Sequence, residues 1–195
     1  MKSKTFGTVY LFAQDDIDTD SIIPAKYLTT ADMQELAWHV LEPLREDNAL
    51  LKAGGKVDLL ENVEDARGAS KTIDPKKSTE LVDDEKFRSP VVVAGKNFGC
   101  GSSREHAVWA LVGAGVQAVI AESFARIFFR NSVNFGLPTF VIPEATKKFS
   151  AQDVVEIDPV KNKIKNLSQK TEFEFEPLPE FLSEIVKAGG LLNQI

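Results

Sequence analysis

The hydrophobic positions along this chain form short runs that predict strands alternating with helices. Residues 90–94 and 116–121 are almost wholly apolar, which is typical of buried strands, and apolar residues recur at helical spacing after each of them. The predicted order is strand, helix, strand, helix, strand, over residues 90–94, 103–112, 116–121, 123–133 and 137–142. This succession indicates an α/β fold with parallel strands and crossover helices, in which ligands bind beyond the carboxyl ends of the strands.

Further elements are predicted on both sides of this unit. Residues 6–13 have the composition of a strand, and the apolar residues of 32–44 lie on one face of a helix that Pro43 ends or kinks. His39 falls off that face and is interpreted as a surface side chain, because no partner lies at metal-ligand spacing. The C-terminal part predicts a hairpin, a strand with one solvated face and a closing helix capped by glycine, over residues 154–157 with 163–167, 171–176 and 179–188.

Residues 45–88 show no clear hydrophobic pattern and are rich in charged residues, Gly and Ser. We interpret them as an insertion, partly ordered and partly mobile, within a single domain that spans residues 1–195.

Composition narrows the classes of partner. The net charge is -6 and no Lys/Arg cluster occurs, which argues against nucleic acid and anionic membranes. No apolar run reaches the ~20 residues that span a bilayer. The single cysteine, Cys100, excludes an intrachain disulfide and an iron-sulfur cluster held by this chain alone. We therefore expect a soluble protein of a reducing compartment, the cytoplasm or an organelle after removal of a targeting peptide.

The turn after residues 90–94 carries the candidate chemistry. Gly99 and Gly101 permit a close approach of a ligand to the main chain, and Ser102 with Glu105 has the spacing of a capping box at a helix start. Free N–H groups and the guanidinium of Arg104 would then converge on one place, which predicts an oxyanion site. The pattern is neither a dinucleotide fingerprint nor a P-loop.

Two hydroxyls lie beside this predicted anion site. Ser102 and Ser103 are placed to move a proton on or off a bound carboxylic acid. The alternative is that Ser102 only caps the helix and Arg104 is a solvated residue of its first turn. Cys100 fits a small buried filler, although a loop rich in N–H donors can lower a thiol pKa.

Three ordered motifs give a resemblance to a known family. Residues 97–107 (NFGCGSSREHA), 18–24 (DTDSIIP) and 123–138 resemble the small subunits of isopropylmalate isomerases, in the aconitase superfamily. The resemblance implies the swivelling β/β/α domain of that superfamily. It also implies a hydro-lyase that interconverts 2-isopropylmalate and 3-isopropylmalate through isopropylmaleate, in leucine biosynthesis, and that is active only with a large subunit.

The resemblance also implies roles for individual residues. Ser102 matches the base that takes a proton from carbon, whereas Ser103 and Arg104 match residues that hold substrate carboxylate, next to Gly101. Thr19 and Asp20 are expected in the active-site wall, with Asp20 paired with a basic group on another domain or subunit. This chain is expected to bind no cofactor, and the 4Fe-4S cluster is expected in the large subunit, in a heterodimer or heterotetramer.

Tyr27, Leu28 and Thr29 are expected to select the substrate. By the resemblance, an arginine after Tyr-Leu suits a substrate with an extra carboxylate, and Thr29 leaves such a carboxylate without a partner. This favours isopropylmalate over the substrates of homoaconitase, citraconate hydratase or dimethylmalate hydratase. A non-catalytic anion-binding module and a nucleotide-binding α/β domain are the alternatives from other classes.

Overall fold

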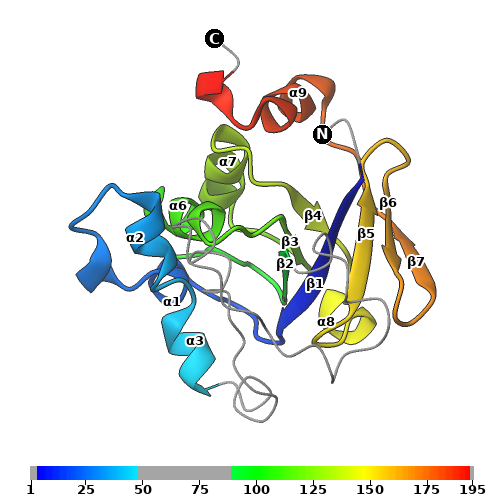
Figure 1. Cartoon of the computed structure of the whole chain (residues 1–195), viewed down its shortest axis with the longest axis horizontal. Coiled ribbons are helices and arrows are strands. Elements are labelled where there is room, and N and C mark those ends of the chain that lie inside the picture. The colour runs from blue at the N-terminus through cyan, green and yellow to red at the C-terminus, as the bar shows by residue number, and fades with distance from the viewer. Residues whose placement is uncertain (1–3, 48–88, 194–195) are drawn as a thin grey trace, which may run out of the picture.

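A computed structural model describes residues 4–47 and 89–193 of the chain (Figure 1). Within these described residues, seven strands form one mixed sheet in the order β4-β3-β2-β1-β5-β6-β7. Their bounds are Thr5–Phe12 (β1), Pro90–Ala94 (β2), Ala118–Ala121 (β3), Thr139–Val141 (β4), Val154–Asp158 (β5), Lys163–Asn166 (β6) and Thr171–Glu174 (β7). Most of the insertion predicted at residues 45–88 lies outside the described residues.

The first four strands of this order form the parallel half of the sheet. β1 pairs with β2, β2 with β3 and β3 with β4, all parallel. The crossovers are α6 (His106–Gly113) and α7 (Arg126–Asn134), so the predicted α/β unit and its order are confirmed. The helices start three residues later than predicted.

The C-terminal strands form an antiparallel extension of the same sheet. β5 pairs antiparallel with β1, and β5, β6 and β7 then form a meander, which confirms the predicted hairpin. The closing helix α9 (Glu180–Ala188) ends at Gly189 in the left-handed conformation, as a glycine cap requires. The sheet curls enough that Phe140 of β4 meets Phe175, just beyond β7, with ring centroids 4.5 Å apart.

The sheet separates two hydrophobic cores. In β2, Val92 and Ala94 face the core beneath α6 and α7, whereas Val91 and Val93 face the core enclosed by the curled antiparallel half. A strand buried on both faces explains why residues 90–94 are apolar throughout. In the part of the chain that the structure describes, no helix is long and apolar enough to cross a membrane.

The single helix predicted over residues 32–44 is wrong. The chain instead forms α2 (Met33–Ala37) and α3 (Glu42–Asp47), separated at Leu41, which has a left-handed φ of 54°. The N–H of Leu41 donates to the carbonyl of Ile22 at 2.7 Å, so a tertiary contact interrupts the helix. Pro43 lies in the first turn of α3, where a missing N–H costs nothing, and is not the point of the break.

Four short elements were not predicted from the sequence. They are α1 (Thr19–Ile22), η1 (Ala25–Tyr27), α8 (Ala145–Lys148) and η3 (Leu191–Asn193). Each is three or four residues long, which is too short for a hydrophobic period to identify.

Candidate active site

Three loops meet at the carboxyl ends of β1, β2 and β3. The N–H of Gly99 donates to the carbonyl of Ile17 at 2.7 Å, and the N–H of Thr19 donates to the carbonyl of Cys100 at 2.9 Å. On the other side, the N–H of Phe98 donates to the carbonyl of Ser123 at 3.0 Å. The loop that contains the Gly-Ser-Ser-Arg sequence is therefore held between its neighbours by backbone hydrogen bonds, at the end of the sheet predicted for a ligand site.

Carboxylates of the β1–α1 loop fasten that loop to its surroundings. Three of them accept hydrogen bonds of 2.7 Å: Asp15 from the N–H of Lys96, Asp16 from the side-chain amide of Asn97 and Asp18 from the N–H of Ser21. Within residues 4–47 and 89–193, no group of three or more His, Cys, Asp or Glu side chains is arranged to hold a metal ion. The acidic loop therefore serves as an anchor for the neighbouring loop.

Asp20 and Arg104 form an ion pair within the chain. Arg104 Nη1 donates to Asp20 Oδ1 at 2.7 Å, although the two residues are 84 positions apart in the sequence. A basic group on another domain or subunit was the expected partner of Asp20; the structure instead gives it Arg104 of the same chain. One nitrogen of the guanidinium is used here, and the remaining N–H groups of an arginine fork are available to a second carboxylate.

The predicted capping box is not formed. α6 begins at His106, and Glu105 at its N-cap makes no side-chain capping hydrogen bond. The N–H of Ser102 donates instead to Thr19 Oγ1 at 3.1 Å. Ser102 therefore belongs to the loop and is not the start of the helix, so the interpretation of this serine as a helix cap is also wrong.

The serine hydroxyls are left for a ligand. Neither Ser102 Oγ nor Ser103 Oγ hydrogen-bonds to another described residue, and the main chain holds both serines in place. The carbonyl of Ser103 accepts from Nδ2 of Asn131, a buried residue of α7, at 3.3 Å. Asn131 thus has the structural role of holding α7 to the loop. Half-buried Ser102 and exposed Ser103 lie beside Arg104 in the chain.

The two glycines of the loop are required for different reasons. Gly99 has a φ of 78°, and a side chain there would overlap the ring of Phe128. Gly101 has a φ of 90°, but the nearest atom to an added Cβ is Thr19 Oγ1 at 3.5 Å. Gly99 lets α7 pack against the loop, whereas a Cβ at Gly101 would make only ordinary van der Waals contacts, so Gly101 is required for its positive φ.

Cys100 is not an activated nucleophile. Burial raises the pKa of its thiol, and the nearby carboxylates of Asp16 and Asp18 raise it further. The thiol donates to the carbonyl of Asp16 at 3.4 Å. Burial and these carboxylates outweigh the lowering of the pKa by a backbone hydrogen bond, and the interpretation of Cys100 as a small packing residue fits.

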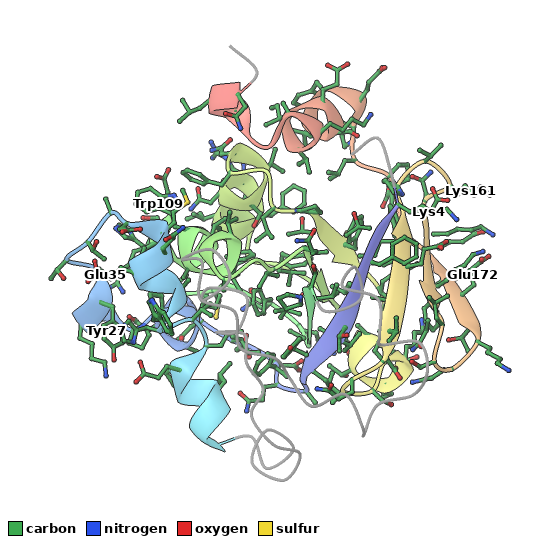
Figure 2. The ribbon with its side chains drawn as sticks, viewed as in Figure 1. Lys4, Tyr27, Glu35, Trp109, Lys161 and Glu172 are labelled. Atoms are coloured by element: carbon green, nitrogen blue, oxygen red, sulfur yellow. The ribbon has the colours of Figure 1, made fainter. Side chains whose placement is uncertain are left out.

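Tyr27, Leu28 and Thr29 lie on the segment between α1 and α2. The ring of Tyr27 stacks on His39 with centroids 3.5 Å apart, so His39 is a packed residue and not a free surface side chain. Figure 2 shows Tyr27 on the side formed by α1, α2 and α3, away from Glu172 of the antiparallel strands. Tyr27 and Leu28 pack against the same core as Phe98 of the loop. The structure thus brings Asp20, Gly101, Ser102, Ser103 and Arg104 together, and it shows no hydrogen bond or ring contact from residues 27–29 to these described residues.

Thr19, which the resemblance places in the active-site wall, makes a contact that the sequence analysis did not predict. Thr19 is buried, and its hydroxyl accepts from the N–H of Ser102, which fixes the backbone that carries the proposed reactive hydroxyl. The sequence signal for Thr19 was its position within the Asp-Thr-Asp motif.

The curled mixed sheet and its Gly-Ser-Ser-Arg loop define the class of protein. Residues 13–145 match the family described as aconitase C-terminal domain. The crystal structure of 3-isopropylmalate dehydratase from Methanocaldococcus jannaschii is 37% identical and superposes with a TM-score of 0.72, covering 98% of this chain and 92% of that chain. The swivelling β/β/α fold expected from the resemblance is confirmed.

Curated relatives narrow the class further. The 3-isopropylmalate dehydratase small subunit of Caldicellulosiruptor saccharolyticus is 45% identical over 92% of this chain and 84% of its own length. That of Moorella thermoacetica is 43% identical over 100% of this chain and 92% of its own length. This chain belongs to the family of 3-isopropylmalate dehydratase small subunits.

Proposed function

We propose that this chain is the small subunit of an isopropylmalate isomerase, which interconverts 2-isopropylmalate and 3-isopropylmalate through isopropylmaleate in leucine biosynthesis. The observation that carries the proposal is the loop around Ser102 and Arg104. Backbone hydrogen bonds and the Asp20–Arg104 pair hold this loop rigidly at the carboxyl ends of the parallel strands. Family membership supports the same activity.

Ser102 acts in this proposal as the base that takes the proton from the substrate carbon. A serine oxygen can accept that proton only as an alkoxide, and a free serine hydroxyl is not ionised at neutral pH. The neighbouring guanidinium of Arg104 provides a positive charge that stabilises this developing negative charge. In the reverse direction the Ser102 hydroxyl returns the proton to carbon.

Arg104 and Ser103 hold a substrate carboxylate in this proposal. Asp20 accepts from one nitrogen of Arg104 and orients the guanidinium, so the remaining N–H groups face the substrate. The exposed hydroxyl of Ser103 donates to the same carboxylate. Fixing the carboxylate fixes the carbon whose proton Ser102 removes.

A large subunit is required to complete the site. The chain has one cysteine, and its described residues provide no metal-ligand cluster, so they do not fit an iron-sulfur centre of their own. The relatives are named small subunits, which supports a large-subunit partner in a heterodimer or heterotetramer. A 4Fe-4S cluster of that partner would supply Lewis-acid chemistry at the substrate hydroxyl. We place the complex in the cytoplasm, where a single free thiol stays reduced.

Thr29 is proposed to favour isopropylmalate among related substrates. It is exposed and uncharged, and it follows Tyr27 and Leu28 on the segment after η1. No guanidinium is available there for the third carboxylate of a homoaconitate-type substrate. The alternative is a related hydro-lyase that acts on citraconate or dimethylmalate. Activity assays with each substrate would distinguish it from an isopropylmalate isomerase.

The test is reconstitution under anaerobic conditions. The chain is mixed with a cluster-loaded isopropylmalate isomerase large subunit from the same source, and isopropylmaleate absorbance is followed. Activity is expected in the mixture and in neither component alone. If the complex forms but turns over only another 2-hydroxy acid, that acid replaces isopropylmalate as the proposed substrate. If the complex forms but turns over no 2-hydroxy acid, the anion-binding module is favoured.

A further inference from the structure

A cavity of about 90 Å³ lies far from the candidate active site. It is enclosed by the start of β4, by α9 and by segments that flank β6 and β7. Thr139 begins β4, whereas the active-site loops follow the last residues of β1, β2 and β3, so the two places are at opposite ends of the parallel strands. In Figure 1, α9 lies at the top of the view.

The wall of this cavity is mainly apolar. Seven of its eleven lining residues are apolar, and they include Phe140, Phe175 and Val186. Phe140 and Phe175 touch where the curled sheet brings β4 near the end of β7. The cavity therefore lies at the seam of the sheet and is suited to a hydrocarbon group.

One of the lining residues, Thr139, begins the terminal strand of the sheet. Pro138 and Ile142 hydrogen-bond towards β3. Because backbone groups alternate in direction along a parallel strand, the N–H and C=O of Thr139 point towards the free edge. The side chain is 5% exposed, and its Oγ1 is buried without a hydrogen-bond partner among the described residues, which is uncommon in folded proteins. Thr139 can thus donate to a ligand from its backbone N–H.

The charge of the lining is unusual for this chain. The chain has a net charge of -6, yet no Asp or Glu lines the cavity. Lys187, in the last turn of α9, is the one charged lining residue, and none of the ion pairs among the described residues involves it. Ser183 and Asn162 add further hydrogen-bond donors to the lining. Donors and a single cation select an anionic, hydrogen-bond-accepting group.

We propose that this cavity binds a small apolar monocarboxylate. The hydrocarbon part lies against Phe140, Phe175 and Val186, and the carboxylate accepts from Lys187 and Thr139. A hydroxy-dicarboxylate of the kind assigned to the Ser102 loop does not fit, because its second carboxylate would be buried against aromatic rings without a partner. The site is therefore separate from the catalytic one and does not depend on the proposed activity.

The test is a titration of the uniformly ¹⁵N-labelled full chain with 3-methylbutanoate, followed by NMR. Saturable shifts are expected for amides of residues 138–140 and 183–187 and not for residues 99–104. The neutral isostere 3-methylbutanamide should bind at least about tenfold more weakly, which corresponds to ~1.4 kcal/mol. Lys187→Met, which keeps the length of an exposed side chain, should weaken binding of the acid by about the same factor.

Matched variants keep the test decisive. Lys147→Met removes an exposed lysine of α8 outside the cavity and should leave the affinity unchanged. Thr139→Val keeps the shape of the side chain and removes the hydroxyl; if it does not fold, Lys187→Met carries the test alone. The proposal is overturned if no saturable shift occurs or if the shifts fall on residues 99–104. It is also overturned if the acid and the amide bind wild type with equal affinity and Lys187→Met does not change the affinity for the acid.

Discussion

Arg104 Nη1 lies 2.7 Å from Asp20 Oδ1, and this contact joins the loop after β2 to the short helix after β1. The Asp20 side chain is 55% exposed and that of Arg104 is 32% exposed, so water screens the pair. Such a pair stabilises a fold by at most about 1 kcal/mol. Its importance is in fixing the direction of the guanidinium.

Asp20→Asn should therefore reduce activity more than stability. We expect the free energy of unfolding to change by less than about 1 kcal/mol, while kcat/KM of the reconstituted complex falls by about tenfold or more because Arg104 loses its orientation. Denaturant unfolding and steady-state kinetics measure the two effects. Glu144→Gln breaks the exposed pair with Lys147, also 2.7 Å long, and should change neither. Unchanged kcat/KM in Asp20→Asn would remove Asp20 from the site.

Ser102→Ala should nearly abolish turnover without unfolding the chain. The Ser102 hydroxyl has no hydrogen-bond partner among the described residues. The backbone N–H of Ser102 donates to Thr19 Oγ1, and alanine keeps this contact. We expect kcat to fall by about 10²-fold to 10⁴-fold, the contribution of a positioned proton-transfer group. Ser103→Ala should raise KM more than it lowers kcat. Ser150→Ala, on the exposed surface after α8, is the control, and wild-type kcat in Ser102→Ala would contradict the proposed base.

Two glycine substitutions should separate steric overlap from backbone strain. Gly101→Ala makes ordinary van der Waals contacts but keeps a positive φ, so we expect a loss of about 1 to 2 kcal/mol in the free energy of unfolding. Gly99→Ala adds an overlap with Phe128 to a similar strain, and the loss should exceed that of Gly101→Ala by about 1 to 3 kcal/mol. Urea denaturation compares the two variants. Equal losses would show that α7 moves away from the loop without cost.

Glu42 should make stability depend on acid pH. Burial acts to raise its pKa, but the hydrogen bond with Tyr27 and the charges of Lys26 and His39 outweigh burial, and the pKa lies below the ordinary value of 4.5. Nδ1 of His39 lies 3.3 Å from Oε2 of Glu42, an electrostatic contact without the geometry of a hydrogen bond. Because the folded state binds the proton less well than the unfolded chain, this stabilisation is present above pH 4.5 and is lost as the pH falls through the lowered pKa.

The measurement for Glu42 is a comparison of unfolding free energies across pH. Wild type should be more stable than Glu42→Gln at neutral pH, and the difference should shrink in acid. Tyr27→Phe removes the hydrogen bond and should reduce the same difference at neutral pH. A difference that stays constant from neutral to acid pH would show that the charge of Glu42 does not contribute.

Thr29→Arg should alter substrate choice without altering the fold. Thr29 is exposed, so a longer side chain is accommodated. The guanidinium offers a partner to a third substrate carboxylate and leaves the isopropyl group beside a charge. We expect kcat/KM to fall by about tenfold or more for isopropylmalate and to rise for homoaconitate. Unchanged ratios would place the selective contact elsewhere, and Thr30→Arg is the neighbouring control.

Local patterning predicted the regular part of the fold. The apolar runs that became β2 and β3 are buried on both faces, so their composition was sufficient to identify them. The interruption at Leu41 was not predictable, because apolar residues continue across it at helical spacing. Its cause is a hydrogen bond to Ile22, which lies in another part of the chain.

The sequence singled out residues that the structure brings together, but it did not predict the contacts between them. Ser102 and Glu105 have the spacing of a capping box, and a local rule assigns them to a helix start. The structure prevents this because the N–H of Ser102 is already used by Thr19, 83 positions earlier. The pairing of Asp20 with Arg104 is equally distant in sequence and follows from the parallel pairing of β1 with β2.

The hydrogen bonds from Gly99 to Ile17 and from Thr19 to Cys100 have a consequence for how the site is lost. Both connect parts of the chain that follow β1 and β2, two neighbouring strands in the middle of the sheet. We therefore expect amide hydrogen exchange at Gly99 and Thr19 to be as slow as the cooperative unfolding of the domain. The loop around Ser102 would then be among the last parts of this protein to open, and heating would abolish its geometry only together with the fold.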